Sequence, residues 1–391
     1  MPFTLQGVCY LSVPMPSTRK RNQTGHLNGF HPMRVNLRRS FNAAKPSLAR
    51  NALMAIYASG AHRMAPKAFA GVGVIFMLHR VCENTQAGFA PNRILEITPE
   101  FLESVIGHVR ERGYTCVSLD EAVTRIIAGE TAEKFAVFTL DDGYLDNLTV
   151  AAPIFTRHNV PFTVYLATSL PDETAELWWV ALERIIAKEK SLTVAFPEGA
   201  ETFSTQSDLE KYAAWESIYW RLRALGETAL RTEIRRLAAK HDLNMKDITR
   251  ELAMSWDEVR ALASTPFASV EAHTANHIAM AHLSDDEARG EIAAGVARHE
   301  MELGSYPRHF SYPYGDPTSA SDRDFEIATE FGFRSATTTR KGLIQPHHAD
   351  RLARLPRLSL NGDYQDLRLL DVLLSGLPFA LAKAAGSSEI D

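Results

Sequence analysis

The feature that most constrains the fold is a regular alternation of short β-rich apolar runs with longer helical segments. The runs fall at residues 72–78, 135–140, 162–167, 268–272, 309–312, 335–338 and 355–360. Between them, apolar residues recur at three- and four-residue spacing, as in Phe101, Val105 and Val109, and Gly113 provides a stop for that helix. Strands that alternate with helices indicate parallel β/α architecture. We therefore expect an α/β chain in which strand and helix form the repeating unit.

The alternation does not fill the whole chain. Residues 1–66 are rich in Pro, Asn, Ser and Arg, and we interpret them as an appendage with one helix near 47–62. Residues 67–362 carry the alternation and should form the main domain, while 171–266 contain almost only helical patterns. We interpret 171–266 as a helical insertion, and 363–391 as a C-terminal helical tail that packs on the domain.

Charge is distributed unevenly along the sequence. The chain has a formal net charge of −5, but residues 1–82 contain eleven Lys or Arg and no Asp or Glu. The overall acidity gives no reason to expect nucleic-acid binding. The basic arm fits a targeting segment, a disordered tail or a helix attracted to an anionic membrane, and the sequence leaves these three interpretations open.

Neither a membrane span nor a metal-binding cysteine pair is expected. The most apolar run, 68–78, is far shorter than the roughly 20 residues that cross a bilayer. Cys9, Cys82 and Cys116 are widely spaced and form no Cys-x-x-Cys pair. Reduced thiols favour a cytoplasmic protein, with peripheral membrane contact through the basic arm as an alternative.

Two adjacent carboxylates end one of the apolar runs. Asp141 and Asp142 follow the run 135–140 and precede Gly143. Neighbouring residues of a strand point to opposite sides, so a turn at Gly143 is needed to bring both carboxylates into one pocket. Alternatively, one of them caps the helix that follows.

A histidine pair follows another run. His273 and His277 come directly after 268–272, and side chains at i and i+4 share one face of a helical turn. Taken alone, such a pair is more often solvated or buried in a core than bound to a metal. Two imidazoles and one carboxylate nevertheless complete the three-ligand pattern of a catalytic metal site, and the second carboxylate is then free to act as a base.

Three motifs, in this order, resemble the polysaccharide deacetylase family, also called the NodB-homology domain or carbohydrate esterase family 4. They are Thr139-Leu140-Asp141-Asp142-Gly143, His273-Thr274-Ala275-Asn276-His277 and Tyr312-Pro313-Tyr314-Gly315. The third motif alone would be an ordinary aromatic turn. The likeness extends over about 70–362, and it implies a distorted (β/α) barrel, usually with seven units, whose site lies at the C-terminal ends of the strands.

The resemblance also implies a role for each residue. Asp141 would be the general base, while Asp142, His273 and His277 would hold a divalent metal, most often Zn²⁺. The backbone N–H at Tyr314 would stabilise the oxyanion. The implied reaction is hydrolysis of an N-acetyl group, in which water attacks the acetyl carbonyl and Asp141 takes the proton from that water.

Two features of the family are missing from this chain. Many members carry Arg two residues before the Pro of the third motif, where this chain has Ser311; Arg357 or Arg354 could replace it. The Leu-x-His motif that supplies the family's general acid is also absent. The candidates for that acid are His79, at the end of the first run, and the loop pair His347-His348. The strand-end position favours His79.

Together these observations predict a metal-dependent hydrolase that removes N-acetyl groups from N-acetylglucosamine-type residues of an oligosaccharide, a polysaccharide or a lipid-linked glycan. Two alternatives remain: a hydrolase of another C–N amide bond, and a non-catalytic glycan-binding barrel. The insertion carries Trp178, Trp179, Trp215 and Trp220. These favour sugars, because sugar rings stack on aromatic faces, although each could equally lie in a core.

Overall fold

The computed structural model describes residues 45–83 and 88–390. Most of the basic arm, and with it the interpretations made for residues 1–44, lies outside the described residues. The helix expected near 47–62 is present as α2 (Lys45–Ser59) and α3 (Ala61–Met64). In the described part of the chain, no helix is both long enough and apolar enough to cross a membrane.

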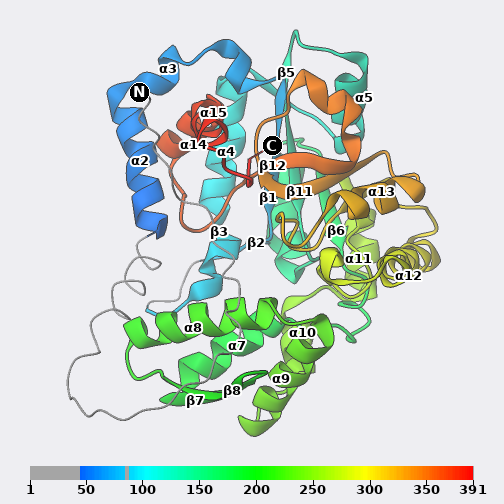
Figure 1. Ribbon diagram of the computed structural model, residues 1–391. Coiled ribbons are helices and arrows are strands. Elements are labelled where there is room, and N and C mark those ends of the chain that lie inside the picture. Colours follow the sequence, from blue (N-terminus) through cyan, green and yellow to red (C-terminus); the bar gives the residue numbers. More distant parts are fainter. Residues whose placement is uncertain (1–44, 84–87, 391) are drawn as a thin grey trace, which may run out of the picture. The chain divides into compact units, whose positions relative to one another are not determined.

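Seven parallel strands close into a barrel (Figure 1). Around the ring they follow the order β1-β12-β11-β10-β9-β6-β5, and β5 pairs again with β1. The strands are β1 (Gly73–Leu78), β5 (Lys134–Leu140), β6 (Phe162–Leu166), β9 (Ala268–Ala272), β10 (His309–Ser311), β11 (Ser335–Lys341) and β12 (Leu355–Ser359). Each predicted run forms one barrel strand, so the expected seven-unit (β/α) barrel is confirmed.

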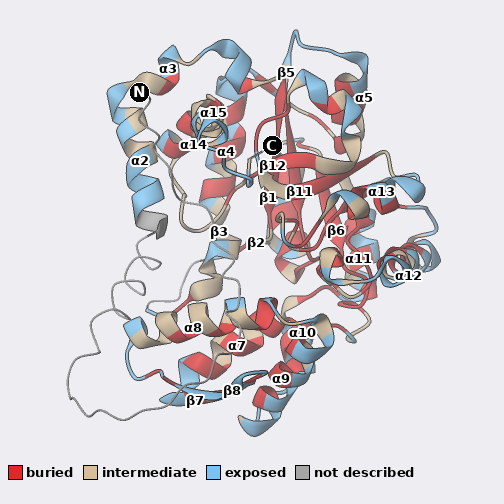
Figure 2. Ribbon diagram, in the orientation of Figure 1, coloured by how far each residue is buried: buried red, intermediate tan, exposed pale blue. Residues whose placement is uncertain are grey.

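The barrel strands form where apolar side chains can be buried on both faces. All six residues of β1 and all five of β6 are buried, as expected for parallel strands covered by helices. Figure 2 shows this burial along the barrel strands. Outside the ring, β4 (Tyr114–Cys116) pairs with the first half of β5, and β2 (Arg80–Val81) pairs with β3 (Glu96–Ile97).

The outer helices begin and end at local sequence signals. The side chain of Thr98 accepts a hydrogen bond from the backbone N–H of Phe101 and starts α4 (Pro99–Glu111). A capping box at Ser284 starts α12 (Asp285–Leu303), and Gly304 ends it in the left-handed conformation. The other helices around the barrel are α5 (Leu119–Ala128), α6 (Ala152–Arg157), α11 (Trp256–Ala263) and α13 (Asp322–Glu330).

The insertion has a core of its own and is not continuous helix. Its elements are α7 (Trp178–Lys188), β7 (Ser191–Phe196), β8 (Gly199–Ser204), α8 (Asp208–Arg223), α9 (Glu227–Lys240) and α10 (Met245–Leu252). The expectation of almost continuous helix is wrong at the antiparallel hairpin of β7 and β8. Leu192, Val194 and Phe196 are buried and alternate with less buried residues, which is the two-residue period of a strand.

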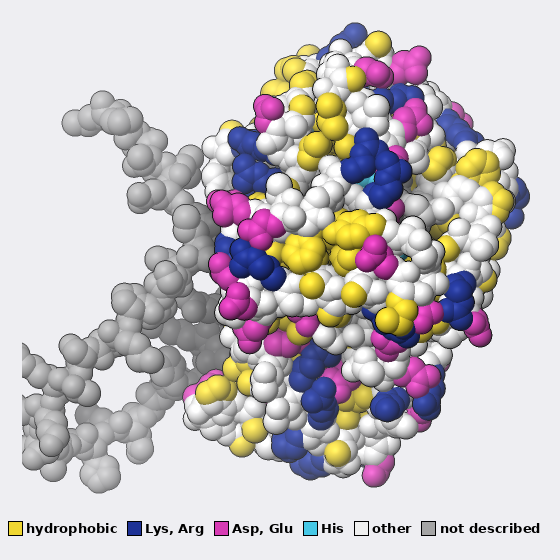
Figure 3. Space-filling view, turned by 90° about the vertical axis from the view of Figure 1, so that its right-hand side faces the viewer, with side chains coloured by type: hydrophobic (Ala, Val, Ile, Leu, Met, Phe, Trp, Pro, Cys, Tyr) yellow, Lys and Arg dark blue, Asp and Glu magenta, His cyan; other side chains and the backbone are white. Residues whose placement is uncertain are grey.

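The C-terminal tail packs on the main domain through its first helix. α14 (Leu367–Leu374) buries Leu370 and Leu374 in the barrel's core cluster, so the expected packing is confirmed for this helix. Gly376 is the N-cap of α15 (Leu377–Ala384), which carries Pro378 in its first turn, where the missing N–H costs no hydrogen bond. On the face shown in Figure 3, basic and acidic side chains lie close together with hydrophobic groups among them.

Strand register brings the predicted site residues to one end of the barrel. Leu78 of β1 pairs with Leu140 of β5, and Ala272 of β9 pairs with Leu166 of β6 and Phe310 of β10. Residues that follow these positions therefore emerge at the carboxyl ends of neighbouring strands. This is the end at which barrel enzymes build their sites.

Candidate active site

The Asp pair sits at a sharp turn after β5. Asp142 has a φ of 76° and Gly143 a φ of 88°. A Cβ at Gly143 would lie 2.4 Å from Leu166 Cδ1, so only glycine fits there. The turn places both carboxylates in the interior, where Asp141 and Asp142 are each 2% exposed. Asp141 faces Arg357 of β12, and Asp142 faces the loop that follows β9.

The His pair lies in a loop after β9, which differs from the helical turn inferred from its spacing. Thr274 and His277 have positive φ values of 59° and 54°, which a helix excludes. Side chains hold this loop: Glu291 of α12 accepts hydrogen bonds from the backbone N–H of Asn276 at 3.0 Å and from its Nδ2 at 2.8 Å. The loop still brings the two imidazole rings to 5.1 Å between centroids.

Asp142, His273 and His277 meet at one point. Asp142 Oδ1 lies 3.5 Å from His273 Nε2 and 3.0 Å from His277 Nε2. His273 Nδ1 lies 2.7 Å from the carbonyl oxygen of Ser311. A carbonyl oxygen can only accept a hydrogen bond, so we assign the ring proton of His273 to Nδ1. The Nε2 atom, which faces Asp142, then carries no proton and has a lone pair that could bind a metal ion.

Electrostatics favour the ligand forms of these groups. Burial alone would raise the pKa of Asp142, but the neighbouring His277 and His273 outweigh it and hold that pKa well below its usual value. Burial lowers the pKa of His277 more than Asp142 raises it. At neutral pH Asp142 is therefore a carboxylate and His277 a neutral imidazole.

Arg357 of β12 holds Asp141 apart from this group. Its Nη1 and Nη2 each donate a 2.7 Å hydrogen bond to Asp141, one to each carboxylate oxygen. Arg357 is 1% exposed, and its Nη2 also donates to Ser311 Oγ at 3.0 Å. Burial opposes ionisation of Asp141, but the charge and hydrogen bonds of Arg357 outweigh it and lower the pKa.

The structure thus decides between the two arginine candidates. Arg357 occupies the place expected for the missing arginine, with its guanidinium against Ser311, the residue at the family's arginine position. Arg354 pairs instead with Asp322 at 3.1 Å on the outside. In this chain the arginine that binds Asp141 comes from β12 and reaches across the barrel interior, whereas the resemblance places it on β10.

His79 and the loop pair His347-His348 lie at opposite ends of the barrel. His79 directly follows Leu78, the last residue of β1. Leu78 pairs with Leu140, so His79 lies at the same strand ends as the Asp pair. Ile344, shortly before the loop pair, bridges to Gly73, the first residue of β1. Of the acid candidates, only His79 lies at the end that holds the two carboxylates.

The insertion contributes residues that sequence reasoning did not assign to the site. Trp179 lies with its ring 5.1 Å from that of His277, and its Nε1 donates to the hydroxyl of Tyr144 at 3.2 Å. Trp178 reaches Tyr314 of the third motif. The sequence shows these tryptophans, but it does not show which strand ends they cover. Trp220 is 59% exposed and lies on the surface of α8.

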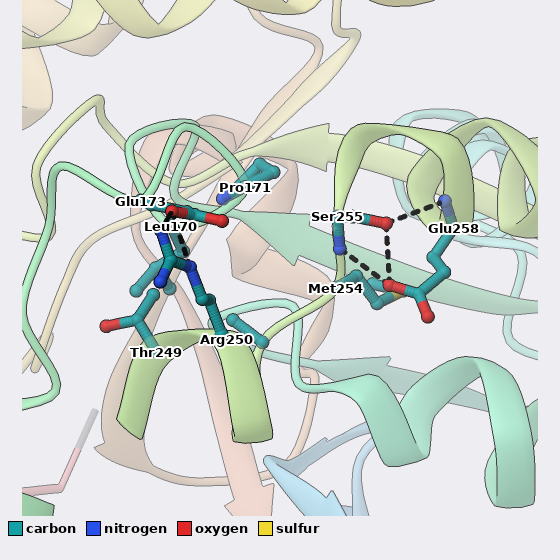
Figure 4. A pocket seen from close by; sticks show the side chains of 9 residues that line it. Leu170, Pro171, Glu173, Thr249, Arg250, Met254, Ser255 and Glu258 are labelled. Atoms are coloured by element: carbon teal, nitrogen blue, oxygen red, sulfur yellow. Dashed lines mark hydrogen bonds and ion pairs between the residues drawn. The ribbon is translucent and has the colours of Figure 1, made fainter. Parts of the chain in front are cut away.

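A cavity of about 80 Å³ near the insertion is separate from these residues (Figure 4). Its wall includes Glu173, Arg250, Ser255 and Glu258. Arg250 is paired with Glu173 at 2.7 Å, and Ser255 with Glu258 in a capping box. These polar groups of the wall are therefore paired with one another.

Comparison with known proteins agrees with this arrangement. The sequence profile of the family described as polysaccharide deacetylase matches residues 231–336, which contain the second and third motifs. No curated protein gives a significant match.

Two solved structures match most of this chain. The Streptococcus pyogenes deacetylase PplD in complex with acetate shares 15% identity and a TM-score of 0.50, over 77% of this chain and 97% of that one. IcaB from Ammonifex degensii shares 16% identity and a TM-score of 0.49, over 78% and 97%. The likeness to PplD, at 15% identity, shows the fold alone. Residues 231–336 thus match the polysaccharide deacetylase family, and the seven-stranded barrel gathers all three motifs at one end, as the resemblance of the sequence implies.

Proposed function

We propose that the protein is a metal-dependent hydrolase that removes N-acetyl groups from N-acetylglucosamine-type residues of an oligosaccharide, a polysaccharide or a lipid-linked glycan. The observation that carries this proposal is the separation of two neighbouring carboxylates. Asp142 faces His273 and His277, whereas Asp141 is held by Arg357. This separation supports the role of a metal ligand for Asp142 and of a general base for Asp141.

Asp142, His273 and His277 fit a divalent metal ion. One ligand atom from each lies within 4.8 Å of the others, and all three residues are buried. Asp142 Oδ1 has no hydrogen-bond partner despite its burial, which is costly unless a cation balances it. A divalent ion bound there, with Zn²⁺ the first candidate, would polarise the acetyl carbonyl and make water more acidic.

The chain's own groups supply the rest of the reaction. Asp141 is ionised at neutral pH and is suited to take the proton from the attacking water, and the two hydrogen bonds from Arg357 fix its orientation. The backbone N–H of Tyr314 is the expected donor to the oxyanion formed at the acetyl carbon. His79 is our candidate to protonate the leaving amine.

We expect His277→Ala to remove most of the affinity for Zn²⁺, because it deletes one of three ligands. Purified parent protein should bind about one Zn²⁺ per chain, and isothermal titration calorimetry measures the loss. His282→Ala is the matched control, since His282 is an exposed histidine five residues further along. Equal Zn²⁺ affinity in His277→Ala, His273→Ala and the parent would show that the ligands are misassigned.

We expect His79→Ala to lower kcat about 10²- to 10⁴-fold, the usual contribution of a general acid. Metal content and melting temperature should stay near those of the parent, because His79 is only partly buried. His347→Ala, in the loop at the opposite end of the barrel, should keep parental turnover. Full activity in His79→Ala, with loss in a combined change of His347 and His348, would transfer the role to the loop.

One assay separates the proposed function from its alternatives. Zn²⁺-loaded protein is incubated with a panel of N-acetylated oligosaccharides, and mass spectrometry detects the loss of acetyl groups. Loss of acetyl supports the proposal. Calorimetric binding of the same glycans without turnover would identify a glycan-binding barrel. Small amides and formamides are incubated in parallel, and activity on them alone would identify a hydrolase of another C–N bond.

A further inference from the structure

Tyr314 has an unusual backbone conformation for a residue that carries a side chain. Its φ is 60°, and Gly315 follows with a φ of 58°. Only glycine fits at the second position, because a Cβ there would lie 2.7 Å from the backbone nitrogen of Thr339. A positive φ is unfavourable for tyrosine and persists where surrounding contacts hold it. The contacts of Tyr314 therefore decide where its backbone N–H points.

The insertion supplies contacts to the Tyr314 ring from two helices. Trp178 Nε1, at the start of α7, donates a 2.9 Å hydrogen bond to the Tyr314 hydroxyl. The guanidinium carbon of Arg223, at the end of α8, lies 3.5 Å from the centroid of the Tyr314 ring. Trp178 is 0% exposed and Arg223 is 7% exposed. Both contacts are thus shielded from water, where a hydrogen bond and a cation–π contact are stronger.

Arg223 also binds the chain just after Tyr314. Its Nη2 donates to Ser319 Oγ at 2.7 Å and lies 3.3 Å from Asp316 Oδ2. Trp178 stacks on Tyr219 of α8 with ring centroids 5.0 Å apart, so the two helices reach the third-motif loop as a packed pair. The Tyr314 ring in turn lies 4.8 Å from that of His277.

We infer that Trp178 and Arg223 are positioning residues for turnover: they hold Tyr314 and thereby the backbone N–H that stabilises the oxyanion. This inference rests on the proposed function. A loop amide needs no particular side chain to donate a hydrogen bond, but in this chain the Tyr314 ring is the point at which the insertion fixes that amide. The insertion therefore takes part in catalysis as well as covering the barrel.

A double-mutant cycle tests the Trp178 contact. Trp178→Phe removes the indole N–H and Tyr314→Phe removes the hydroxyl, so each single change breaks the same hydrogen bond. Each should lower kcat about 10- to 100-fold with little change in KM, as expected for a misplaced oxyanion donor. The double variant should be no slower than the slower single variant, because the bond is lost only once. The substrate is the panel oligosaccharide that the parent hydrolyses fastest.

Substitutions that remove or keep the positive charge test the role of Arg223. Arg223→Met should lower kcat to a similar extent, and Arg223→Lys should restore part of it, since a lysine can still place a cation over the ring. Arg221→Met is the matched control, because Arg221 on the same helix pairs with Glu198 and Glu201 and should not affect turnover. Zn²⁺ affinity and melting temperature should remain close to parental in Trp178→Phe.

A second measurement does not depend on activity. In ¹⁵N NMR spectra, the indole signal of Trp178 should shift in Tyr314→Phe, whereas that of the exposed Trp220 should not. Parental kcat in both Trp178→Phe and Arg223→Met would overturn the inference while leaving the proposed function supported by the parent's turnover. A parent inactive on every glycan of the panel would overturn the proposed function and the inference together.

Discussion

Asp141→Asn should lower turnover about 10²- to 10⁴-fold and keep its metal, whereas Asp142→Asn should lose the metal. The two residues are neighbours, but Asp141 is bound by Arg357 and Asp142 faces two imidazoles. An asparagine at 141 cannot accept the proton of the attacking water. An asparagine at 142 offers only a neutral oxygen to a cation. Kinetics and metal analysis of both variants, side by side, measure the difference.

The comparison carries its own controls. Both changes are isosteric and remove one buried charge, so a general loss of folding would affect both variants. Asp141→Asn also leaves the buried Arg357 without its countercharge, so thermal unfolding must be recorded for each variant. Loss of metal in Asp141→Asn with retention in Asp142→Asn would reverse the two roles.

The barrel could be predicted because its strands carry a strong and local signal. Runs such as 72–78 and 162–167 are almost entirely apolar, since residues such as Phe76 and Tyr165 are buried on whichever face they point to. Burial on both faces needs helices on the outside, and the intervening segments have the spacing of helices. The hairpin at β7 and β8 was missed because its alternating pattern is short and lies between long helices.

The sequence predicts those site residues that directly follow a strand, and it does not predict the residues whose position depends on loops. Asp141 and His273 each follow a strand directly, so their meeting follows from the barrel itself. The positive φ of His277 could not be inferred, because it depends on loop contacts with α12. Contacts from the insertion, such as Trp178 to Tyr314, join residues far apart in the chain and depend on how two separate cores pack.

The choice between Arg357 and Arg354 also could not be predicted from the sequence. Two arginines close to the last strand could replace the missing one, and the sequence does not distinguish them. Arg357 lies in β12 and points into the barrel, whereas Arg354 precedes the strand and pairs with the exposed Asp322. The direction of the side chain decides between them, and the sequence does not reveal it for two arginines only three residues apart.

Arg357→Met should destabilise the protein by about 3–5 kcal/mol, because it leaves the buried carboxylate of Asp141 without its partner. It should also abolish most turnover, since the base loses both hydrogen bonds that orient it. Arg354→Met removes a pair that is partly open to water and should cost no more than about 1 kcal/mol. Urea denaturation of the parent and both variants gives the free energies of unfolding.

Two combined changes show whether the effect comes from the unpaired charge. Asp141→Asn in the Arg357→Met background removes the stranded carboxylate and should recover much of the lost stability without restoring turnover. Ser311→Arg in the same background supplies a guanidinium from β10, the strand used by many family members, and should recover part of both, because Ser311 Oγ lies 3.0 Å from Arg357 Nη2. If Arg357→Met unfolds at the same urea concentration as Arg354→Met and keeps parental turnover, Arg357 neither balances nor orients Asp141, and the base must be held by another group.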